Sequence, residues 1–558
     1  MREAEGTVIR QIVLVSGPVG AGKTTLCQSL EQHFTARHFK SREFLLKEAD
    51  PSNDPSKPTP RNVLQALGNK LDKQTRGAWI VKGIQSEIEQ HPKTELLLID
   101  AVRIQWQIDA IRNSYGSYGF RVVHIHVTAP QTELERRYLD RSRSRAHQKT
   151  GITELGSYAD VLKDDTERKV ERLAKDADIV IDTTRNTVQD VLVRAASHLG
   201  LYGREYARLC DVIVGGQYGS EGKGQVVGYL AKEYDFLVRV GGPNAGHTVY
   251  AEPTPYKYHH LPSGTRHSLA KIIIGPGAVI SVPGIQREIS ECRIGQDRLF
   301  IDPQAMIIDD QDRNEEAALV ASIGSTGQGV GSATARRIMG RGKNTVRLAR
   351  DIRDLAPYTR TAARTLLDEA FRNKANVLLE GTQGTGLSIY HGSYPHVTSR
   401  DTTVAGCLAE AGIAPSRVRK VIMVCRTYPI RVESPPGQGN GSGPMSQEIT
   451  LGEVHRRSGI PLAELEKTET TTTTNKRRRI AEFDWELLRN SAALNGPTDI
   501  ALTFVDYHTI TNRKARRFDQ LRDDTIRFVE EVERVAGAPV SLISTRFHSR
   551  SIIDRRAW

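Results

Sequence analysis

The sequence predicts an α/β protein of two units, the first a parallel sheet with helices on both faces and the second another α/β sheet. Short apolar runs alternate with helical patterns along the whole chain. A glycine-rich turn follows the first run, at 9–16, and the same pattern restarts at 212–214. The chain has 558 residues, too many for one ordinary core. We therefore expect two domains, 1–205 and 206–558.

The expected strands follow from the apolar runs and the turns between them. In the first unit they are 9–16, 95–100, 121–127 and 178–181. In the second unit they are 212–214, 236–240, 271–274, 377–379, 421–424 and 500–505. The polar stretch 50–60 contains four prolines and is expected to be a surface loop.

Composition narrows the classes of function. Hydrophobic residues make up 38% and charged residues 26%, as in soluble globular proteins. Five scattered cysteines without a CxxC pair favour a reducing, cytoplasmic setting, and neither a secretory signal nor a membrane span is predicted. The net charge of +12 is concentrated at 136–145 and 476–479. Anionic small-molecule substrates explain these clusters, so nucleic acid is not the expected partner, although a nucleic-acid ATPase stays a third interpretation.

The first glycine-rich turn, GPVGAGKT at 17–24, matches GxxxxGK(S/T) between a strand and a helix. Backbone N–H groups and the helix dipole can surround phosphate oxygens there. We expect the residues of this turn to bind a nucleoside triphosphate and Mg²⁺, with Lys23 on the phosphates and the Thr24 hydroxyl on the metal. The nucleotide-binding candidates are Gly17, Gly22, Lys23 and Thr24.

The first 200 residues resemble P-loop kinases of nucleoside and deoxynucleoside monophosphates. LLIDAVR at 97–103 is similar to their strand that ends in a metal-associated acid and a substrate-phosphate arginine. Arg136, Arg137, Arg141 and Arg143 resemble the lid arginines of this class, although a solvated helix face explains them equally well. The acceptor of the phosphoryl group stays open.

Two further glycine-rich turns open the second unit. GQYGSEGKG at 216–224 and GGPNAGHT at 241–248 each follow a predicted strand, so their amides are expected to surround one polyphosphate. Together they resemble the paired signatures of adenylosuccinate synthetases. The resemblance continues through IGSTGQG at 323–329, EGTQGTG at 380–386, HGSYPHVTS at 391–399 and TTNKRRR at 473–479. It covers about 350 residues and is closest to the short archaeal and viral forms.

This resemblance implies a fold and a reaction. The fold is a P-loop kinase-like parallel-sheet domain followed by an adenylosuccinate synthetase-like α/β domain. The family phosphorylates O6 of a purine mononucleotide with a nucleoside triphosphate, and the amino group of L-aspartate then displaces phosphate at C6. A homodimer is implied, because an arginine similar to Arg341 comes from the partner subunit in the family.

The resemblance also implies the site residues. The catalytic candidates are His247, Ser220, Lys223 and Gln383. The triphosphate candidates are Gly219, Gly222, Gly224, Thr248, Asp506 and Ser544, and the Gly246 carbonyl is the Mg²⁺ ligand. The candidates for the mononucleotide are Asn244, Thr326, Arg341 and Thr398, and those for aspartate are Thr473, Thr474, Lys476 and Arg478.

Two departures from the family pattern bear on specificity. Ser220 stands at the position of an aspartate that takes the N1 proton and binds Mg²⁺, and a serine hydroxyl is no base unaided. The smaller side chain favours a purine with a 2-amino group, (d)GMP, over IMP, and it resembles the viral 2-aminoadenylosuccinate branch. Phe504 and Arg546 replace residues around the triphosphate base, so ATP or dATP is expected beside GTP. A catalytically silent nucleotide sensor is the rival interpretation.

Overall fold

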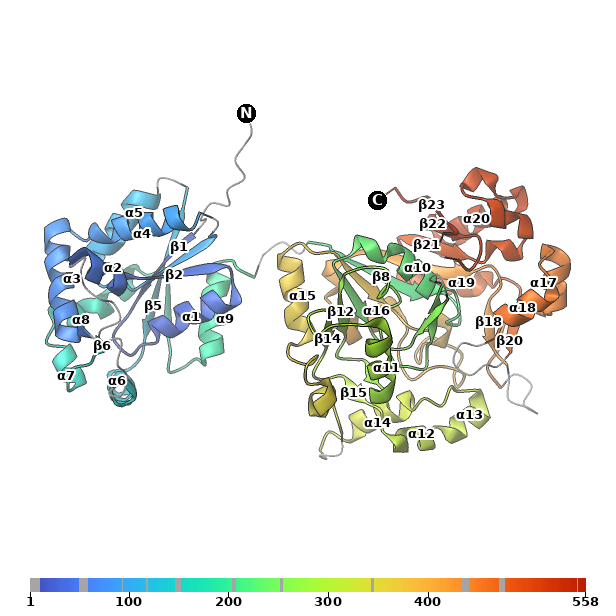
Figure 1. Cartoon of the computed structure of the whole chain (residues 1–558), viewed down its shortest axis with the longest axis horizontal. Coiled ribbons are helices and arrows are strands. Elements are labelled where there is room, and N and C mark those ends of the chain that lie inside the picture. Colours follow the sequence, from blue (N-terminus) through green and yellow to red (C-terminus); the bar gives the residue numbers. More distant parts are fainter. Residues whose placement is uncertain are drawn as a thin grey trace. The chain divides into compact units, whose positions relative to one another are not determined.

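The chain divides into two compact units, Met1–Arg204 and Glu205–Trp558 (Figure 1). A computed structural model describes residues 11–49, 59–92, 94–116, 119–145, 152–202, 207–250, 254–342, 346–433, 441–470, 477–548 and 550–557. None of the helices in these ranges is long and apolar enough to cross a membrane.

The described residues of the N-terminal unit form a five-stranded parallel sheet in the order β2-β4-β1-β5-β7. The strands are β1 (Gln11–Ser16), β2 (Ala36–Lys40), β4 (Leu96–Asp100), β5 (Arg121–Thr128) and β7 (Ile179–Asp182). The helices are α1 (Lys23–His33), α2 (Ser41–Ala49), α3 (Arg61–Thr75), α4 (Trp79–Gln90), α5 (Gln105–Tyr115), α6 (Gln131–Arg145), α7 (Tyr158–Val161), α8 (Asp165–Lys169) and α9 (Val188–His198).

Alternation along β1 sends successive side chains to opposite faces of this sheet. Val13 and Val15 pack with buried residues of α1 and α9, whereas Ile12 and Leu14 pack with those of α4 and α5. Helices therefore cover both faces, as predicted. Strand β2 was not predicted because Phe39 is its one buried residue, which leaves no apolar pattern to recognise.

The loop expected at 50–60 is wrong at its carboxyl end. Thr59–Pro60 forms β3, which pairs in parallel with β6 (Ile152–Thr153). A two-residue strand at an edge tolerates proline, because the missing N–H need not enter a ladder. Residues 50–58 of the expected loop lie outside the described residues.

The C-terminal unit has a nine-stranded sheet within its described residues, in the order β14-β12-β9-β16-β8-β17-β21-β22-β23. Its strands are β8 (Cys210–Gly215), β9 (Phe236–Arg239), β12 (Lys271–Ile274), β14 (Leu299–Ile301), β16 (Val377–Glu380), β17 (Val418–Arg426), β21 (Asp499–Thr503), β22 (Val540–Ser544) and β23 (Ile552–Asp554). All neighbours are parallel except β22 and β23. The predicted α/β sheet is confirmed.

Helices cover both faces of this sheet too. One face of the central strands packs on α15 (Ala363–Arg372), α16 (Val404–Ala411), α19 (Trp485–Asn495) and α20 (Asp523–Ala536). The opposite face packs on α10 (Lys223–Leu230). Helix α11 (Val282–Cys292) packs on β12 and β14. The other helices of this unit are α12 (Asp310–Glu315), α13 (Ala317–Ile323), α14 (Val330–Met339), α17 (Leu451–Ser458) and α18 (Leu462–Thr468) (Figure 1).

Small sheets supplement the large one. They pair β10 (His247–Val249) with β11 (Tyr256–Tyr258), β13 (Val279–Ile280) with β15 (Met306–Ile307), and β20 (Arg478–Ala481) with β18 (Ile430–Val432) and β19 (Glu448–Ile449). The strand expected at 500–505 ends at Thr503, because Phe504 has φ 58° in the left-handed region, where a strand cannot continue.

Candidate functional site

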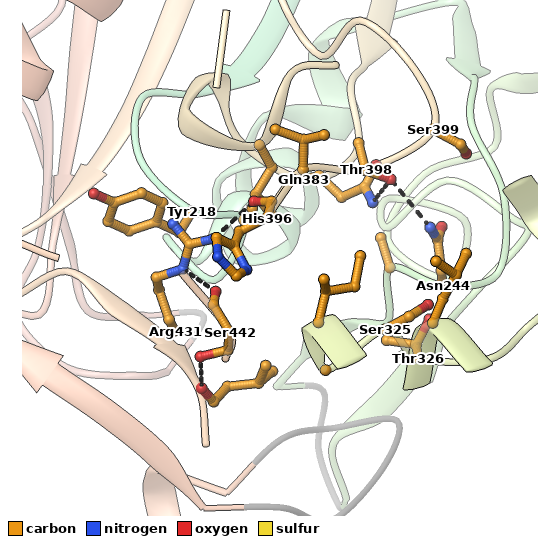
Figure 2. A pocket seen from close by; sticks show the side chains of 18 of the residues that line it. Tyr218, Asn244, Ser325, Thr326, Gln383, His396, Thr398, Ser399, Arg431 and Ser442 are labelled. Atoms are coloured by element: carbon orange, nitrogen blue, oxygen red, sulfur yellow. Dashed lines mark hydrogen bonds between the residues drawn. The ribbon is translucent and has the colours of Figure 1, made fainter. Parts of the chain in front are cut away.

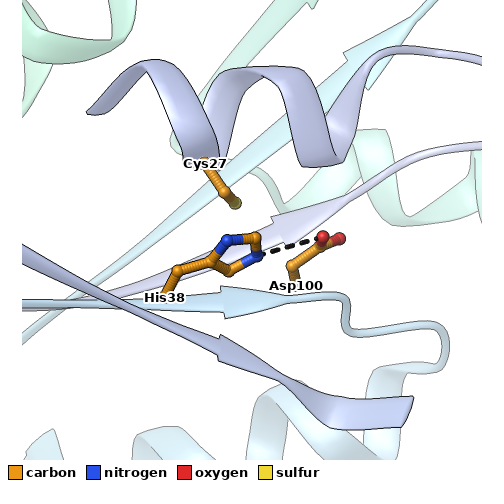
Figure 3. A group of neighbouring side chains, drawn as sticks. All are labelled: Cys27, His38 and Asp100. Carbon is orange, nitrogen blue, oxygen red and sulfur yellow. Dashed lines mark hydrogen bonds and ion pairs between the residues drawn. The ribbon is translucent and has the colours of Figure 1, made fainter. Parts of the chain in front are cut away.

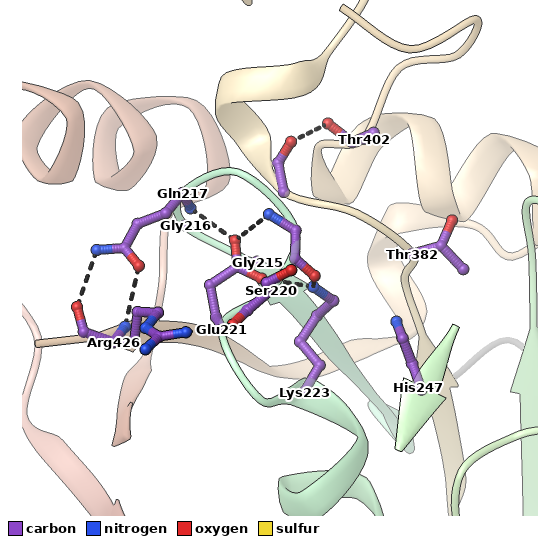
Figure 4. Close-up of polar contacts among 12 residues, drawn as sticks. Gly215, Gly216, Gln217, Ser220, Glu221, Lys223, His247, Thr382, Thr402 and Arg426 are labelled. Carbon is purple, nitrogen blue, oxygen red and sulfur yellow. Dashed lines mark hydrogen bonds and ion pairs between the residues drawn. The ribbon is translucent and has the colours of Figure 1, made fainter. Parts of the chain in front are cut away.

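The turn after β8 places backbone amides and a lysine at the start of α10. Gly222 precedes the helix with φ 89°, in the left-handed region that glycine adopts without strain. The buried carboxylate of Glu221 accepts hydrogen bonds from the amides of Gln217 (3.0 Å) and Gly219 (2.8 Å) and contacts Lys223 Nζ at 2.6 Å (Figure 4). Lys223 is only 1% exposed. The turn is thus held rigid from within.

A buried cluster orients His247, which comes from the following turn. Its Nδ1 lies 2.5 Å from Glu380 Oε1 at the end of β16, and Arg239 contacts the same carboxylate at 2.9 Å. Ser263 contacts Glu380 through both its amide and its hydroxyl. The Nδ1 proton therefore faces a carboxylate, which leaves Nε2 as the reactive nitrogen of His247.

Nε2 of His247 is buried and has no hydrogen-bond partner among the described residues. Burial and the neighbouring Arg239 lower the pKa of His247 to about 4, although Glu380 acts in the opposite direction. Burial raises the pKa of Glu380, but Arg239 and His247 outweigh it and hold that pKa at about 2. The imidazole is thus neutral at pH 7, and an anionic phosphoryl oxygen beside Nε2 would raise its pKa.

A cavity of about 230 Å³ opens beside these turns (Figure 2). Gln383 Nε2 donates to Thr398 Oγ1 at 2.6 Å, and Asn244 Nδ2 approaches the same oxygen at 3.4 Å. The amide oxygens of Gln383 and Asn244 are buried without a hydrogen-bond partner among the described residues. The predicted residues that line the cavity are Gly219, Ser220, Asn244, Gly246, Thr326, Gln383, Thr398 and Arg478.

The start of α14 forms one wall of this cavity. Glu316 accepts hydrogen bonds from the amides of Gly329 (2.7 Å), Gly331 (2.5 Å) and Ser332 (3.3 Å). The Glu316 carboxylate therefore accepts the amide hydrogen bonds at a helix N-terminus, a position that suits an anion. The sequence did not single out Glu316, because it lies outside the IGSTGQG motif.

The residues expected around the triphosphate base lie near the turn that precedes α10. A Cβ at Gly222 would lie 3.6 Å from the ring of Phe504, so this ring packs beside the turn. The Arg426 guanidinium lies 4.2 Å from the centre of the Phe504 ring. Asp506 pairs with Arg513 at 2.9 Å, and its Oδ1 is buried without a hydrogen-bond partner among the described residues. Ser544 Oγ donates to the Arg546 carbonyl.

The residues expected to bind aspartate are only partly described. Thr473, Thr474 and Lys476 lie outside the described residues. Arg478 lines the cavity and pairs with Glu469 at 3.2 Å. Arg341 is exposed at the end of α14, where its Nε donates to the Ile338 carbonyl. The remaining candidates lie in the two glycine-rich turns, 216–224 and 241–248, and do not line the cavity. They are His247, Lys223, Gly222, Gly224 and Thr248.

The phosphate turn of the N-terminal unit has its own polar neighbours. Lys23 Nζ donates to the carbonyls of Gly17 (2.7 Å) and Pro18 (2.9 Å). Burial lowers the pKa of Lys23 to about 8. The Thr24 hydroxyl donates to Asp100 Oδ2 at 2.8 Å, and this oxygen also contacts His38 Nε2 at 3.2 Å (Figure 3). Cys27 completes this group, whose potential ligand atoms lie within 4.8 Å of one another.

The predicted lid arginines divide between the two interpretations. Arg141 pairs with buried Glu154 at 3.2 Å, and Arg137 donates to Thr183 Oγ1 at 2.8 Å. Arg136 is 63% exposed and pairs with Glu133 and Asp140 on its own helix. Arg103, the predicted phosphate ligand, contacts Glu167 beside the turn. Arg136 and Arg143 are thus exposed on the helix face, whereas Arg137 and Arg141 are half-buried and contact other segments of the unit.

Comparison with known proteins decides the family of the C-terminal unit. A sequence model described as adenylosuccinate synthetase matches residues 212–356 and 343–513. The chain belongs to the adenylosuccinate synthetase family. Adenylosuccinate synthetase of Pyrococcus horikoshii is 36% identical over 353 residues, covering 62% of this chain and 98% of that protein. The Methanococcus aeolicus enzyme is also 36% identical, with 62% and 99% covered.

Two solved structures share the fold of this unit. Succinoaminodeoxyadenylate synthetase of cyanophage S-2L, bound to dGMP and dATP as an energy donor, aligns with TM-score 0.54 and 29% identity, covering 63% of this chain and 96% of that one. Adenylosuccinate synthetase of Plasmodium falciparum aligns with TM-score 0.52 and 22% identity, covering 62% and 99%, and shows the fold alone.

A model described as an AAA domain matches residues 13–159. The chain is therefore a carbon–nitrogen ligase of the synthetase family that carries a kinase-like P-loop domain, as the resemblance implied.

Proposed function

We propose that the C-terminal unit joins L-aspartate to C6 of (d)GMP through a 6-phosphoryl intermediate, giving 2-amino-(deoxy)adenylosuccinate. The N-terminal unit is an ATP-dependent nucleotide kinase in this proposal. The observation that carries the purine choice is Ser220, which lines the cavity where the family has a carboxylate. The relative from cyanophage S-2L, which binds dGMP, supports the same choice.

The acceptor atoms of the cavity support a guanine rather than a hypoxanthine. Guanine presents a 2-amino group that hypoxanthine lacks, and buried donors require matched acceptors. The amide oxygens of Gln383 and Asn244 are buried acceptors without a hydrogen-bond partner among the described residues. A 2-amino group and the N1–H of guanine supply donors for such oxygens, while Ser220 leaves room that an aspartate would fill.

The chemistry divides between the two turns. Lys223 and the amides of Gly222 and Gly224 hold the triphosphate, and His247 Nε2 faces the phosphoryl group in transfer. O6 attacks the γ-phosphorus, the bond from this phosphorus to the β,γ-bridging oxygen breaks, and the nucleoside diphosphate leaves with the electron pair. The aspartate amine then attacks C6, and inorganic phosphate leaves. Because Ser220 is no base alone, the N1 proton is lost to water, and Gln383 Oε1, a buried acceptor on the cavity wall, accepts the hydrogen bond that orients N1–H.

Mg²⁺ fits the oxygen donors of both units. In the N-terminal unit Thr24 Oγ1 and Asp100 lie 2.8 Å apart, a pair that suits a hard cation on a polyphosphate. In the C-terminal unit the Gly246 carbonyl would hold the ion beside the phosphate oxygens. The ion supplies charge neutralisation on the polyphosphate when bound.

The triphosphate is ATP or dATP at least as readily as GTP. Phe504 packs beside the turn, where it offers a ring face but no polar group to a guanine edge. Aspartate binds through Thr473, Thr474, Lys476 and Arg478, and its carboxylates suit a guanidinium fork. Arg341, exposed just after the end of α14, reaches the mononucleotide phosphate of a second subunit in a homodimer.

Product analysis tests the proposal. The whole chain is incubated with aspartate, Mg²⁺ and ATP, dATP or GTP, together with IMP, GMP or dGMP, and succinylated nucleotides are measured by mass spectrometry. We expect the fastest product from GMP or dGMP. Preference for IMP would make the chain an ordinary adenylosuccinate synthetase, and no product with any purine would favour a silent nucleotide sensor.

A further inference from the structure

A second cavity of about 390 Å³ lies in the C-terminal unit; it shares no lining residue with the first cavity and touches the glycine-rich turn 241–248 only at Pro243. It is bounded by β11, one side of α11 from Ser281 to Glu291, and the loops that carry Pro243 and Gln328. None of the predicted catalytic or binding residues lines it. A volume of this order suits a small metabolite rather than a single water molecule.

His260 presents an unsatisfied nitrogen to this cavity. The residue is 4% exposed, and its Nε2 is buried without a hydrogen-bond partner among the described residues. A Cβ at Gly284 would lie 3.0 Å from this nitrogen, so a glycine at the start of α11 keeps the space around the imidazole open. A buried polar atom left in this state has a cost that a bound ligand removes.

The N-terminus of α11 faces the same cavity. This helix has eleven residues, and its N-cap Ser281 makes no side-chain cap hydrogen bond. Ser281 Oγ instead accepts from Arg313 at 3.1 Å. Both Ser281 and Gly284 line the cavity. Pro283 has no N–H, so the amides of Val282 and Gly284, with the positive end of the helix dipole, are the groups here that favour an anion.

The charged side chains around the cavity agree with an anion. Lys257, Arg287 and Arg313 line it together with Glu288 and Glu291. Both carboxylates are engaged by the wall. Glu288 accepts three backbone amides, including those of residue 259 at 2.7 Å and residue 261 at 2.9 Å, and Glu291 accepts the Tyr256 hydroxyl at 2.6 Å. Arg287 has neither an ion pair nor a hydrogen bond within the part of the chain that the structure describes.

We propose that this cavity is a regulatory site for a small phosphoanion, either inorganic phosphate or a phosphate monoester. The phosphate oxygens accept hydrogen bonds from the amides at the start of α11, from His260 Nε2 and from Arg287. Inorganic phosphate is released by the ligation itself, so the site is placed to respond to turnover; that assignment of the source rests on the proposed function.

Two loops connect this site to the mononucleotide cavity. Gln328 lines the second cavity, and its Nε2 donates to the carbonyl of Thr326, which lines the first. Pro243 lines the second cavity and directly precedes Asn244, which lines the first. A ligand that draws Gln328 toward itself therefore acts on the loop that holds the mononucleotide, and binding at the two sites is coupled.

Crystals of the whole chain soaked in selenate, a phosphate analogue with an anomalous signal, test the binding. We expect a peak within hydrogen-bond reach of His260 Nε2 in the wild type and in the control Arg364→Ala, and no peak in Arg287→Ala. Arg364 is 85% exposed and lies outside both cavities. An empty cavity at a selenate concentration that fills either phosphate turn overturns the site. A peak that is equal in all three proteins assigns an adventitious ion only and overturns it too.

Kinetics test the coupling and the source. At constant ionic strength, inorganic phosphate and ribose 5-phosphate are each added while KM for dGMP is measured. We expect KM to change about fivefold or more with one of them in the wild type and in Arg364→Ala, a typical size for coupled sites. Either anion can also compete with the substrates at the catalytic turns, and this competition persists in Arg287→Ala. The coupling is therefore measured as the difference in KM change between the wild type and Arg287→Ala, and no such difference overturns it. Absence of ligation with every purine contradicts the proposed function instead, and the crystals still decide the site.

Discussion

The two phosphate turns share a backbone and differ in their side chains. Gly22 has φ 97° and ψ 15°, Gly222 has φ 89° and ψ 22°, and each precedes a helix that begins with a lysine. Neither helix start has a side-chain cap, so the amides are directed to a ligand. The two turns thus share one local conformation, of the kind that suits phosphate binding at a helix N-terminus.

What surrounds each turn differs, and the chemistry follows that difference. After Lys23 comes Thr24, whose hydroxyl contacts Asp100. After Lys223 comes Gly224, which offers no oxygen ligand, and the turn is occupied by its own Glu221. The first turn therefore offers a hydroxyl and a carboxylate that suit a metal ion, whereas in the second turn the proposed metal ligand is the Gly246 carbonyl. The comparison teaches that the backbone sets what is bound and the neighbours set what happens to it.

The largest expected effect is a loss of ligation rate when His247, near the phosphate turn of the C-terminal unit, is replaced. His247→Ala removes the Nε2 that faces the transferred phosphoryl group, and loss of one such group costs about 10²- to 10³-fold in rate. We expect ligation to fall by that factor while phosphoryl transfer by the N-terminal unit is unchanged, as measured by separate assays on one preparation. The control is His455→Ala, on the exposed face of α17 and outside both cavities. Ligation near the wild-type rate in His247→Ala would contradict the assignment.

The reciprocal change is Lys23→Ala. It removes a positive charge from the first turn, and we expect ATP-dependent phosphoryl transfer by the N-terminal unit to fall about 10²-fold, with ligation retained. ADP release from ATP is measured with a coupled assay in the absence of aspartate. The control is Lys40→Ala, on an exposed edge strand. A parallel loss of ligation would show that the two turns do not act independently.

A smaller effect distinguishes the acids beside the turns. Burial raises the pKa of Asp100, but hydrogen bonds from His38 and Thr24 outweigh it and leave that pKa lowered. Burial raises the pKa of Asp506 to about 6, against a weaker effect of Arg513. Because the folded-state pKa is raised, stability from protonated Asp506 is present below pH 3.8 and is lost as pH rises through about 6.

Asp506→Asn therefore stabilises the C-terminal unit at pH 8 and leaves it unchanged near pH 4. The gain is at most about 3 kcal/mol, since two pKa units correspond to about that free energy. Scanning calorimetry at both pH values measures it, with Asp368→Asn, on an exposed helix face, as the control. If Asp506→Asn changed the stability of the C-terminal unit equally at pH 4 and pH 8, the ionisation of Asp506 would not be the cause of the gain.

The sequence predicted the sheets and the cavity residues within the motifs, because strand periodicity and glycine turns are local features. It missed Glu380 as the partner of His247, since the two residues lie 133 positions apart and meet only through the sheet order. It also missed Glu316, which faces α14 from outside its motif, and the left-handed Phe504 that ends β21. Long-range contacts and single backbone reversals leave no periodic trace in a sequence.

The purine specificity of Ser220 is the central claim, and one ratio tests it most directly. kcat/KM is measured for dGMP and for IMP in the wild type and in Ser220→Asp, with Ser325→Asp, elsewhere on the cavity wall, as a control for added charge. A carboxylate at 220 accepts the N1 proton and crowds a 2-amino group. We expect the dGMP-to-IMP ratio to fall about ten- to two-hundredfold in Ser220→Asp only. An unchanged ratio, or one that moves toward dGMP, would contradict the account.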